Sequence, residues 1–216
     1  MKHLWLSFLV IGGLAFLVVI IFFYQSRPIN LEMYFEQTEV EAIEQPTVTF
    51  VNPSKGAEEA TVTFIVFSDF DCTACKQLAN SLDIVLSAYP DSVRIVWKDM
   101  PQESMDGIAT AAAIAAHCAQ KQNRFWEYHD ALFTRQSYLS EDQFLQIATD
   151  LGMDSERFTS CYATQDTLAI VTRDYEEGLG LNLIAAPTLF LNGESHVGAI
   201  STQDLLTVVQ QSLTQH

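Results

Sequence analysis

One buried strand followed closely by an amphipathic helix constrains the fold of this chain more than any other feature of its sequence. The segment Thr61–Phe67 reads TVTFIVF and is almost continuously apolar, which is typical of a strand buried on both faces of a sheet. A helix is predicted after this strand, because apolar side chains recur at helical spacing at Leu78, Leu82, Val85, Leu86 and Tyr89. Pro90 marks the end of the helix, and Ser92–Trp97 predicts the next strand. The sequence therefore predicts an α/β fold.

Segments on both sides add to this order. Upstream, Thr47–Val51 is β-branched and aromatic and predicts a strand, followed by a turn-rich loop. The middle of the chain, about residues 102–178, predicts a helical insert. Asn123 is expected to cap one of its helices, and Ser140 with Gln143 forms a capping-box pattern before another.

The end of the chain returns to strands. Gly178 and Gly180 are expected to mark the exit from the insert, and Pro187–Leu191 predicts a strand. Asn192-Gly193 is a strong hairpin signal, and a last helix is expected from about Thr202 to Leu213. The full order is then β-β-α-β, a helical insert and β-β-α.

The N-terminus carries a long run without charge, Leu4–Tyr24, which is long enough to span a bilayer as a helix. A cleavable signal peptide is the alternative, but its apolar region is usually about 7–15 residues and ends at a small-x-small site, which is missing here. Lys2 favours an N-terminus inside the cell. We therefore expect residues 1–26 to be an uncleaved signal anchor in the inner membrane, 27–46 an acidic linker, and 47–214 a single domain on the periplasmic side.

Two cysteines in the sequence DFDCTACKQL, Cys72 and Cys75, lie where the buried strand passes into the helix. A zinc site needs four ligands, and neither Cys118 nor Cys161 has a partner at the right spacing, so no metal is expected. A structural disulfide here would close too small a loop to restrict the unfolded chain much. The pair is therefore interpreted as a redox dithiol. Cys72 at the helix N-terminus would have a stabilised thiolate, and Cys75 would be more buried.

Four stretches resemble the DsbA-like branch of the thioredoxin superfamily: FSDFDCTAC, HCAQKQNRFWEYHDALF, AAPTLFLNG and HVGAI. They occur in the family's order and cover about Thr61 to Leu213. The resemblance implies a thioredoxin fold with an inserted helical subdomain, and protein thiol–disulfide exchange. It also implies that the Ala186–Pro187 bond is cis and lies against the dithiol, where residue 186 would present its backbone to an extended substrate peptide.

The resemblance has further implications for the cysteines. Cys118 and Cys161 would form a second, structural disulfide; two buried free thiols are the alternative. Between the active cysteines the chain has Thr73 and Ala74, where the family commonly has proline followed by an aromatic residue or histidine. Alanine 186 replaces the usual threonine or valine. Without an imidazole at position 74 the thiolate has one stabilising partner fewer, so we expect a less oxidising pair than in the strongest family oxidases.

Other polar and aromatic residues are given lesser roles. Lys98 and Asp69 are candidates for tuning the pKa of the dithiol from flanking strands. The histidines His129 and His196 are expected to be structural, and the aromatic residues of the insert are expected to serve packing: Phe125, Trp126 and Tyr128.

The leading functional hypothesis is a membrane-anchored protein disulfide oxidase that acts on cysteine-containing exported proteins, with no cofactor besides its own disulfide. A quinone-linked membrane thiol oxidase is the partner that the resemblance suggests. The net charge of −16 argues against nucleic-acid binding, because phosphates would be repelled. The alternatives are a reductase or isomerase that uses the same residues, and a binding or chaperone module in which the dithiol has no role.

Overall fold

The computed structural model describes residues 2–25, 44–102, 105–191 and 193–214. The chain divides into two compact units, Met1–Glu41 and Ala42–His216. The first contains helix α1, Lys2–Gln25, which coincides with the predicted anchor. Within the described residues, no helix combines the length and the apolar character that crossing a membrane requires. The anchor therefore stays a prediction, and most of the predicted linker lies outside the described residues.

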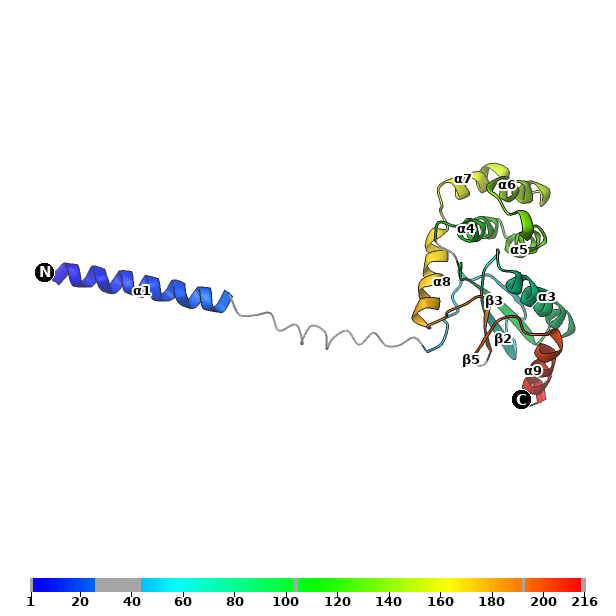
Figure 1. Ribbon diagram of the computed structural model, residues 1–216, viewed down its shortest axis with the longest axis horizontal. Coiled ribbons are helices and arrows are strands. Elements are labelled where there is room, and N and C mark those ends of the chain that lie inside the picture. Colours follow the sequence, from blue (N-terminus) through cyan, green and yellow to red (C-terminus); the bar gives the residue numbers. More distant parts are fainter. Residues whose placement is uncertain (1, 26–43, 103–104, 192, 215–216) are drawn as a thin grey trace. The chain divides into compact units, whose positions relative to one another are not determined.

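The second unit is built on a five-stranded sheet with the order β1-β3-β2-β4-β5 (Figure 1). Central strands β2 and β3 are parallel, with Val62 opposite Val93, and every other pairing is antiparallel. The predicted α/β fold is confirmed, and from Val62 onward the order of strands and helices agrees with the prediction. The strands are β1 Ser54–Gly56, β2 Val62–Ser68, β3 Val93–Asp99, β4 Thr188–Leu191 and β5 Glu194–Val197.

Helices cover both faces of this sheet (Figure 1). On one face, α3 (Thr73–Ala88) and α9 (Thr202–Thr214) pack against apolar side chains of the two central strands. On the other face lies α8, Leu168–Gly180. Helix α8 lies very close to Met100, since a Cβ atom added to Gly178 would be 2.6 Å from the Met100 sulfur. Of the two glycines expected to mark the exit from the insert, Gly180 is the last residue of the helix, whereas Gly178 lies inside the helix and serves packing.

The helical insert stands between β3 and α8. Its helices are α4 Ile108–Gln120, α5 Phe125–Thr134, the short 3₁₀ helix η1 Gln136–Tyr138, α6 Glu141–Asp150 and α7 Ser155–Ala163. Helix α4 is rich in alanine and almost entirely buried, so that its neighbours pack close on all sides. A disulfide between Cys118 and Cys161 joins α4 to α7, with 5.8 Å between the Cα atoms. This pairing agrees with the one implied by the family resemblance.

The first predicted strand, Thr47–Val51, is wrong. This segment is loop and turn, and β1 begins three residues later in the stretch that was predicted to be a loop. Side chains take up its backbone donors: the N–H of Thr47 donates to Glu177, and the N–H of Thr49 donates to Asn52. The segment does not form a strand despite its propensity, because side-chain acceptors bind the backbone N–H groups that a neighbouring strand would otherwise bind.

Of the two predicted helix starts in the insert, one is confirmed. Ser140 caps α6 and accepts a hydrogen bond from the N–H of Gln143. Asn123 is not an N-cap, because α5 begins at Phe125. Asn123 instead takes the left-handed conformation, with φ of 58°, in the turn after α4. Asparagine tolerates this conformation better than most residues, which explains its presence there.

Candidate active site

The turn between β2 and α3 is shaped by a buried carboxylate. Asp69 accepts hydrogen bonds from the N–H groups of Asp71 (2.7 Å) and Gln102 (2.8 Å). Its carbonyl oxygen accepts from the N–H of Cys72. Asp69 thus influences the dithiol by holding the backbone that leads to it. Asp71, the residue before Cys72, is exposed, so solvent screens its charge from the neighbouring dithiol.

Cys72 and Cys75 form a disulfide at the start of α3, with 5.1 Å between their Cα atoms. Cys72 is the N-cap residue and is half-buried, whereas Cys75 is only 1% exposed. The N–H of Cys75 lies 3.0 Å from the Cys72 sulfur and points at it. In the reduced state this N–H and the helix dipole would both stabilise a thiolate on Cys72.

The loop before β4 lies against this disulfide. The Ala186–Pro187 peptide bond is cis, as the family resemblance implied. The carbonyl oxygen of Ala186 is 3.5 Å from the sulfur of Cys72, across 114 residues of sequence. Pro187 is buried, while Ala186 remains partly accessible beside the more exposed cysteine. The structure therefore brings together the dithiol and the loop that the resemblance placed against it.

A residue of the insert that the sequence reasoning missed also contacts the site. The side-chain amide of Gln136 donates to the carbonyl oxygens of Phe70 (2.8 Å) and Cys72 (2.9 Å). These bonds tie η1 to the turn that carries the dithiol. Nothing in the local sequence marks this glutamine, because the contact joins residues more than 60 positions apart and depends on how the insert folds back.

The sequence profile of the thioredoxin family matches residues 50–211, which include the whole of this site. The chain belongs to the thioredoxin family. Among curated relatives, a Na(+)/H(+) antiporter NhaA 3 of Salinispora tropica is 32% identical over 158 residues, which are 73% of this chain and 24% of that protein. The chain spans about a quarter of the length of the curated relatives that it matches. Antiport is a property of those longer proteins.

The fold of this thioredoxin-family chain is similar to that of solved structures. BdbD from Bacillus subtilis in its oxidised form superposes with a TM-score of 0.70 at 18% identity, covering 79% of this chain and 96% of that one. The thiol-disulfide exchange protein alpha-DsbA2 from Wolbachia pipientis gives 0.67 at 19% identity, covering 75% and 87%. The thioredoxin family and fold implied by the resemblance are confirmed.

Lys98 does not approach the dithiol, contrary to one prediction from the sequence. It lies on the α8 face of the sheet, where its ammonium contacts Asp174 (3.0 Å) and Glu177 (2.6 Å). Alternation along β3 explains the difference: Trp97 belongs to the cluster that contains Cys75, so the next side chain points to the opposite face.

The ionisable groups around Lys98 are strongly influenced by burial. Burial and the charge of Asp99 raise the pKa of Asp174, although Lys98 opposes this. Burial would also raise the pKa of Glu177, but hydrogen bonds from Lys98 and Thr47 outweigh it and lower that pKa. Burial would lower the pKa of His117, whereas Asp99 holds it above its ordinary value. These groups form one buried network that fastens α8 and α4 to β3.

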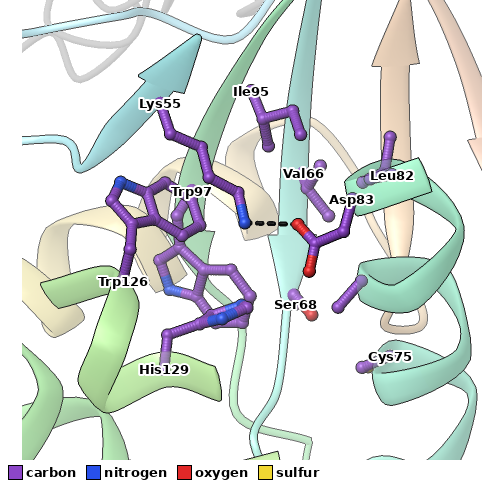
Figure 2. A pocket seen from close by; sticks show the side chains of 11 residues that line it. Lys55, Val66, Ser68, Cys75, Leu82, Asp83, Ile95, Trp97, Trp126 and His129 are labelled. Atoms are coloured by element: carbon purple, nitrogen blue, oxygen red, sulfur yellow. Dashed lines mark hydrogen bonds and ion pairs between the residues drawn. The ribbon is translucent and has the colours of Figure 1, made fainter. Parts of the chain in front are cut away.

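A small pocket lies behind the buried cysteine (Figure 2). Cys75 and Asp83 from α3 line one side, and Trp126 and His129 from α5 line the other. An ion pair between Lys55 and Asp83 spans the pocket. No group of three or more histidine, cysteine, aspartate or glutamate side chains in the described residues is placed to hold a metal ion.

Proposed function

We propose that this chain is a protein thiol–disulfide oxidoreductase that forms disulfides in exported proteins. The observation that carries the proposal is the asymmetry of the Cys72–Cys75 disulfide. Cys72 is accessible, caps a helix and lies beside the Ala186 carbonyl, whereas Cys75 is sealed behind it. One sulfur can therefore meet a substrate while the other serves as an internal leaving group.

In the oxidase direction, a substrate thiolate attacks the sulfur of Cys72. The internal bond breaks, Cys75 leaves as a thiolate, and a mixed disulfide joins Cys72 to the substrate. A second substrate thiolate then attacks the substrate sulfur of that bond and releases reduced enzyme. The N–H of Cys75 that points at the Cys72 sulfur stabilises the departing Cys72 thiolate.

The cis-proline loop is the proposed substrate-binding element. The backbone of Ala186 is partly accessible beside Cys72, and Pro187 has no N–H of its own to satisfy. An extended substrate peptide could pair with this backbone in the manner of an added strand. Such binding recognises the backbone of the substrate rather than its side chains, which suits an enzyme with many substrates.

Thr73 and Ala74 are proposed to make the pair a weaker oxidant than the strongest members of the family. Among the described residues, the only hydrogen-bond donor to the Cys72 sulfur is the N–H of Cys75. A less stabilised thiolate makes the oxidised form relatively more stable. Equilibration of the protein with glutathione at known ratios should give a potential clearly below about −120 mV. A value as high as that would contradict the proposal.

We also propose that the chain acts outside the cytoplasm, held in the inner membrane by residues 1–26. The uncharged run Leu4–Tyr24 supports this, as does the disulfide between Cys118 and Cys161, which suits an oxidising compartment. A quinone-linked membrane thiol oxidase is the proposed partner that restores the Cys72–Cys75 disulfide.

The test of the function compares wild type with Cys72→Ala in the oxidation of a reduced dithiol peptide and in insulin reduction. We expect the variant to lose both activities, because Cys75 is too buried to react with a substrate. Equal activity of the two proteins would favour the alternative of a binding module whose dithiol is incidental. The redox state of the pair in intact cells then distinguishes an oxidase from a reductase.

A further inference from the structure

One ring nitrogen of His129 is hydrogen-bonded to Asp130, and the other has no hydrogen bond to the described residues. The ring is 2% exposed, and its Nδ1 lies 2.7 Å from Oδ1 of Asp130. Burial would raise the pKa of the Asp130 carboxyl, but the hydrogen bond and charge of His129 and the charge of Lys55 outweigh it and lower that pKa, so the carboxylate is ionised and can only accept. Nδ1 must therefore carry the hydrogen, and in the neutral ring Nε2 has a free lone pair.

His129 lines the pocket behind Cys75. Among the described residues the ring has no second hydrogen bond, so Nε2 is available to a water molecule in the pocket. Cys75, Ser68 and His129 all line the same pocket (Figure 2). The pocket is narrow, with room for about one water molecule.

We propose that His129 accepts the proton of the Cys75 thiol, through one water in this pocket, when Cys75 resolves a mixed disulfide. This rests on the proposed exchange at Cys72–Cys75. It assigns a role to a histidine that the sequence suggested was structural. Aromatic rings hold the imidazole in place, with centroid distances of 4.9 Å to both Trp97 and Phe133.

The step balances as follows. Cys72 is bonded to the sulfur of a partner disulfide that it has attacked. The Cys75 thiol loses its proton to His129, and the resulting thiolate attacks the sulfur of Cys72. The Cys72–Cys75 bond forms, the bond to the partner breaks, and the partner sulfur leaves as a thiolate. Cys75 is oxidised, the partner sulfur is reduced, and His129 later releases the proton to solvent. In the oxidase direction Cys75 leaves as a thiolate, and His129 returns the proton to it through the same water.

The charges around His129 are compatible with its role as a proton acceptor. Burial lowers its pKa below the ordinary 6.5, while the Asp130 hydrogen bond and charge oppose this. Lys55 also lowers the pKa and Asp83 raises it. The ring is therefore neutral at pH 7. Once protonated, the imidazolium remains paired with Asp130, whose side chain is 56% exposed and offers the proton a way to solvent.

The test follows the two thiolates released when reduced protein reacts with one equivalent of 5,5′-dithiobis(2-nitrobenzoate). Attack by Cys72 releases the first coloured thiolate, and resolution by Cys75 releases the second. In His129→Phe, which keeps an aromatic ring in the packing, the first phase should keep its rate. The second should slow by at least about tenfold, since a positioned base typically contributes about 10²–10⁴-fold. His196→Phe, an exposed histidine on β5, is the matched control and should change neither phase.

The pH dependence separates proton transfer from a structural role. In wild type the second phase should slow as the pH falls through the depressed pKa of His129. Asp130→Asn removes a charge that raises this pKa, so the pH profile of the second phase should move to lower pH. This exposed substitution also serves if His129→Phe does not fold.

Three outcomes are distinguishable. Equal slowing of both phases, an unchanged second phase in His129→Phe, or an unmoved pH profile in Asp130→Asn would each overturn the role of His129. If wild type releases neither thiolate, the proposed exchange function itself fails.

Discussion

A Cys75→Ser variant is expected to accumulate a covalent mixed disulfide with its substrate. Cys72 keeps its place at the helix N-terminus, where a serine at position 75 still offers its N–H to the Cys72 sulfur. The Cys72 thiolate can therefore attack a disulfide. A serine hydroxyl cannot resolve the product, because an alcohol neither ionises near pH 7 nor forms a bond to sulfur in exchange.

Intact mass under non-reducing conditions measures this trap. Incubation with a disulfide-bonded peptide should add the mass of one peptide half per chain, and a reductant should remove it. The Cys118–Cys161 bond provides no further site for adduct formation. Cys72→Ser is the matched control: its remaining thiol at position 75 is 1% exposed, so little adduct should form. Equal trapping by both variants would mean that the two cysteines have no separate roles.

Replacement of Lys98 by alanine is expected to cost about 3–5 kcal/mol in the free energy of unfolding at pH 7, as for other buried ion pairs that lose one partner. The ammonium lies between Asp174 and Glu177, and its side chain is 2% exposed. Its removal leaves two carboxylates near each other and near Asp99 without a compensating charge. Chemical denaturation monitored by circular dichroism measures the loss.

The pH dependence gives this prediction a second readout. Lys98 lowers the pKa of both Asp174 and Glu177, so its loss raises both values in the folded state. A folded-state pKa above the unfolded value means that stability is lost as the pH rises through it. Lys98→Ala should therefore recover part of its lost stability when the pH is lowered toward the acidic range.

Lys121→Ala is the matched control for Lys98→Ala. Lys121 pairs with Asp166, but their side chains are 47% and 55% exposed. Solvent screens such a pair, and the expected cost is below about 1 kcal/mol. If the two substitutions cost the same, the buried network would not be what fastens α8 to the sheet.

Much of the site could be predicted because its parts are marked by local sequence. Cys72 and Cys75 follow a buried strand directly, and a helix N-terminus is a local feature, so both the pair and its asymmetry follow from a few residues. Pro187 is likewise marked by the strand and hairpin around it. Thr47–Val51 was misassigned because side-chain acceptors overruled its local preference for a strand: Asn52 lies nearby in the sequence, but Glu177 is 130 residues away from Thr47.

The sequence by itself determined the order of strands and helices, the dithiol at a strand-to-helix junction and the family. These depend on hydrophobic periodicity and on motifs read within a few residues. Only the tertiary structure decided that Lys98 faces α8, that Gln136 holds the turn before Cys72, and that His129 shares a pocket with Cys75. Each of these depends on which face of the sheet a side chain takes and on how the insert returns to it. Such contacts join residues far apart along the chain, and no local pattern encodes them.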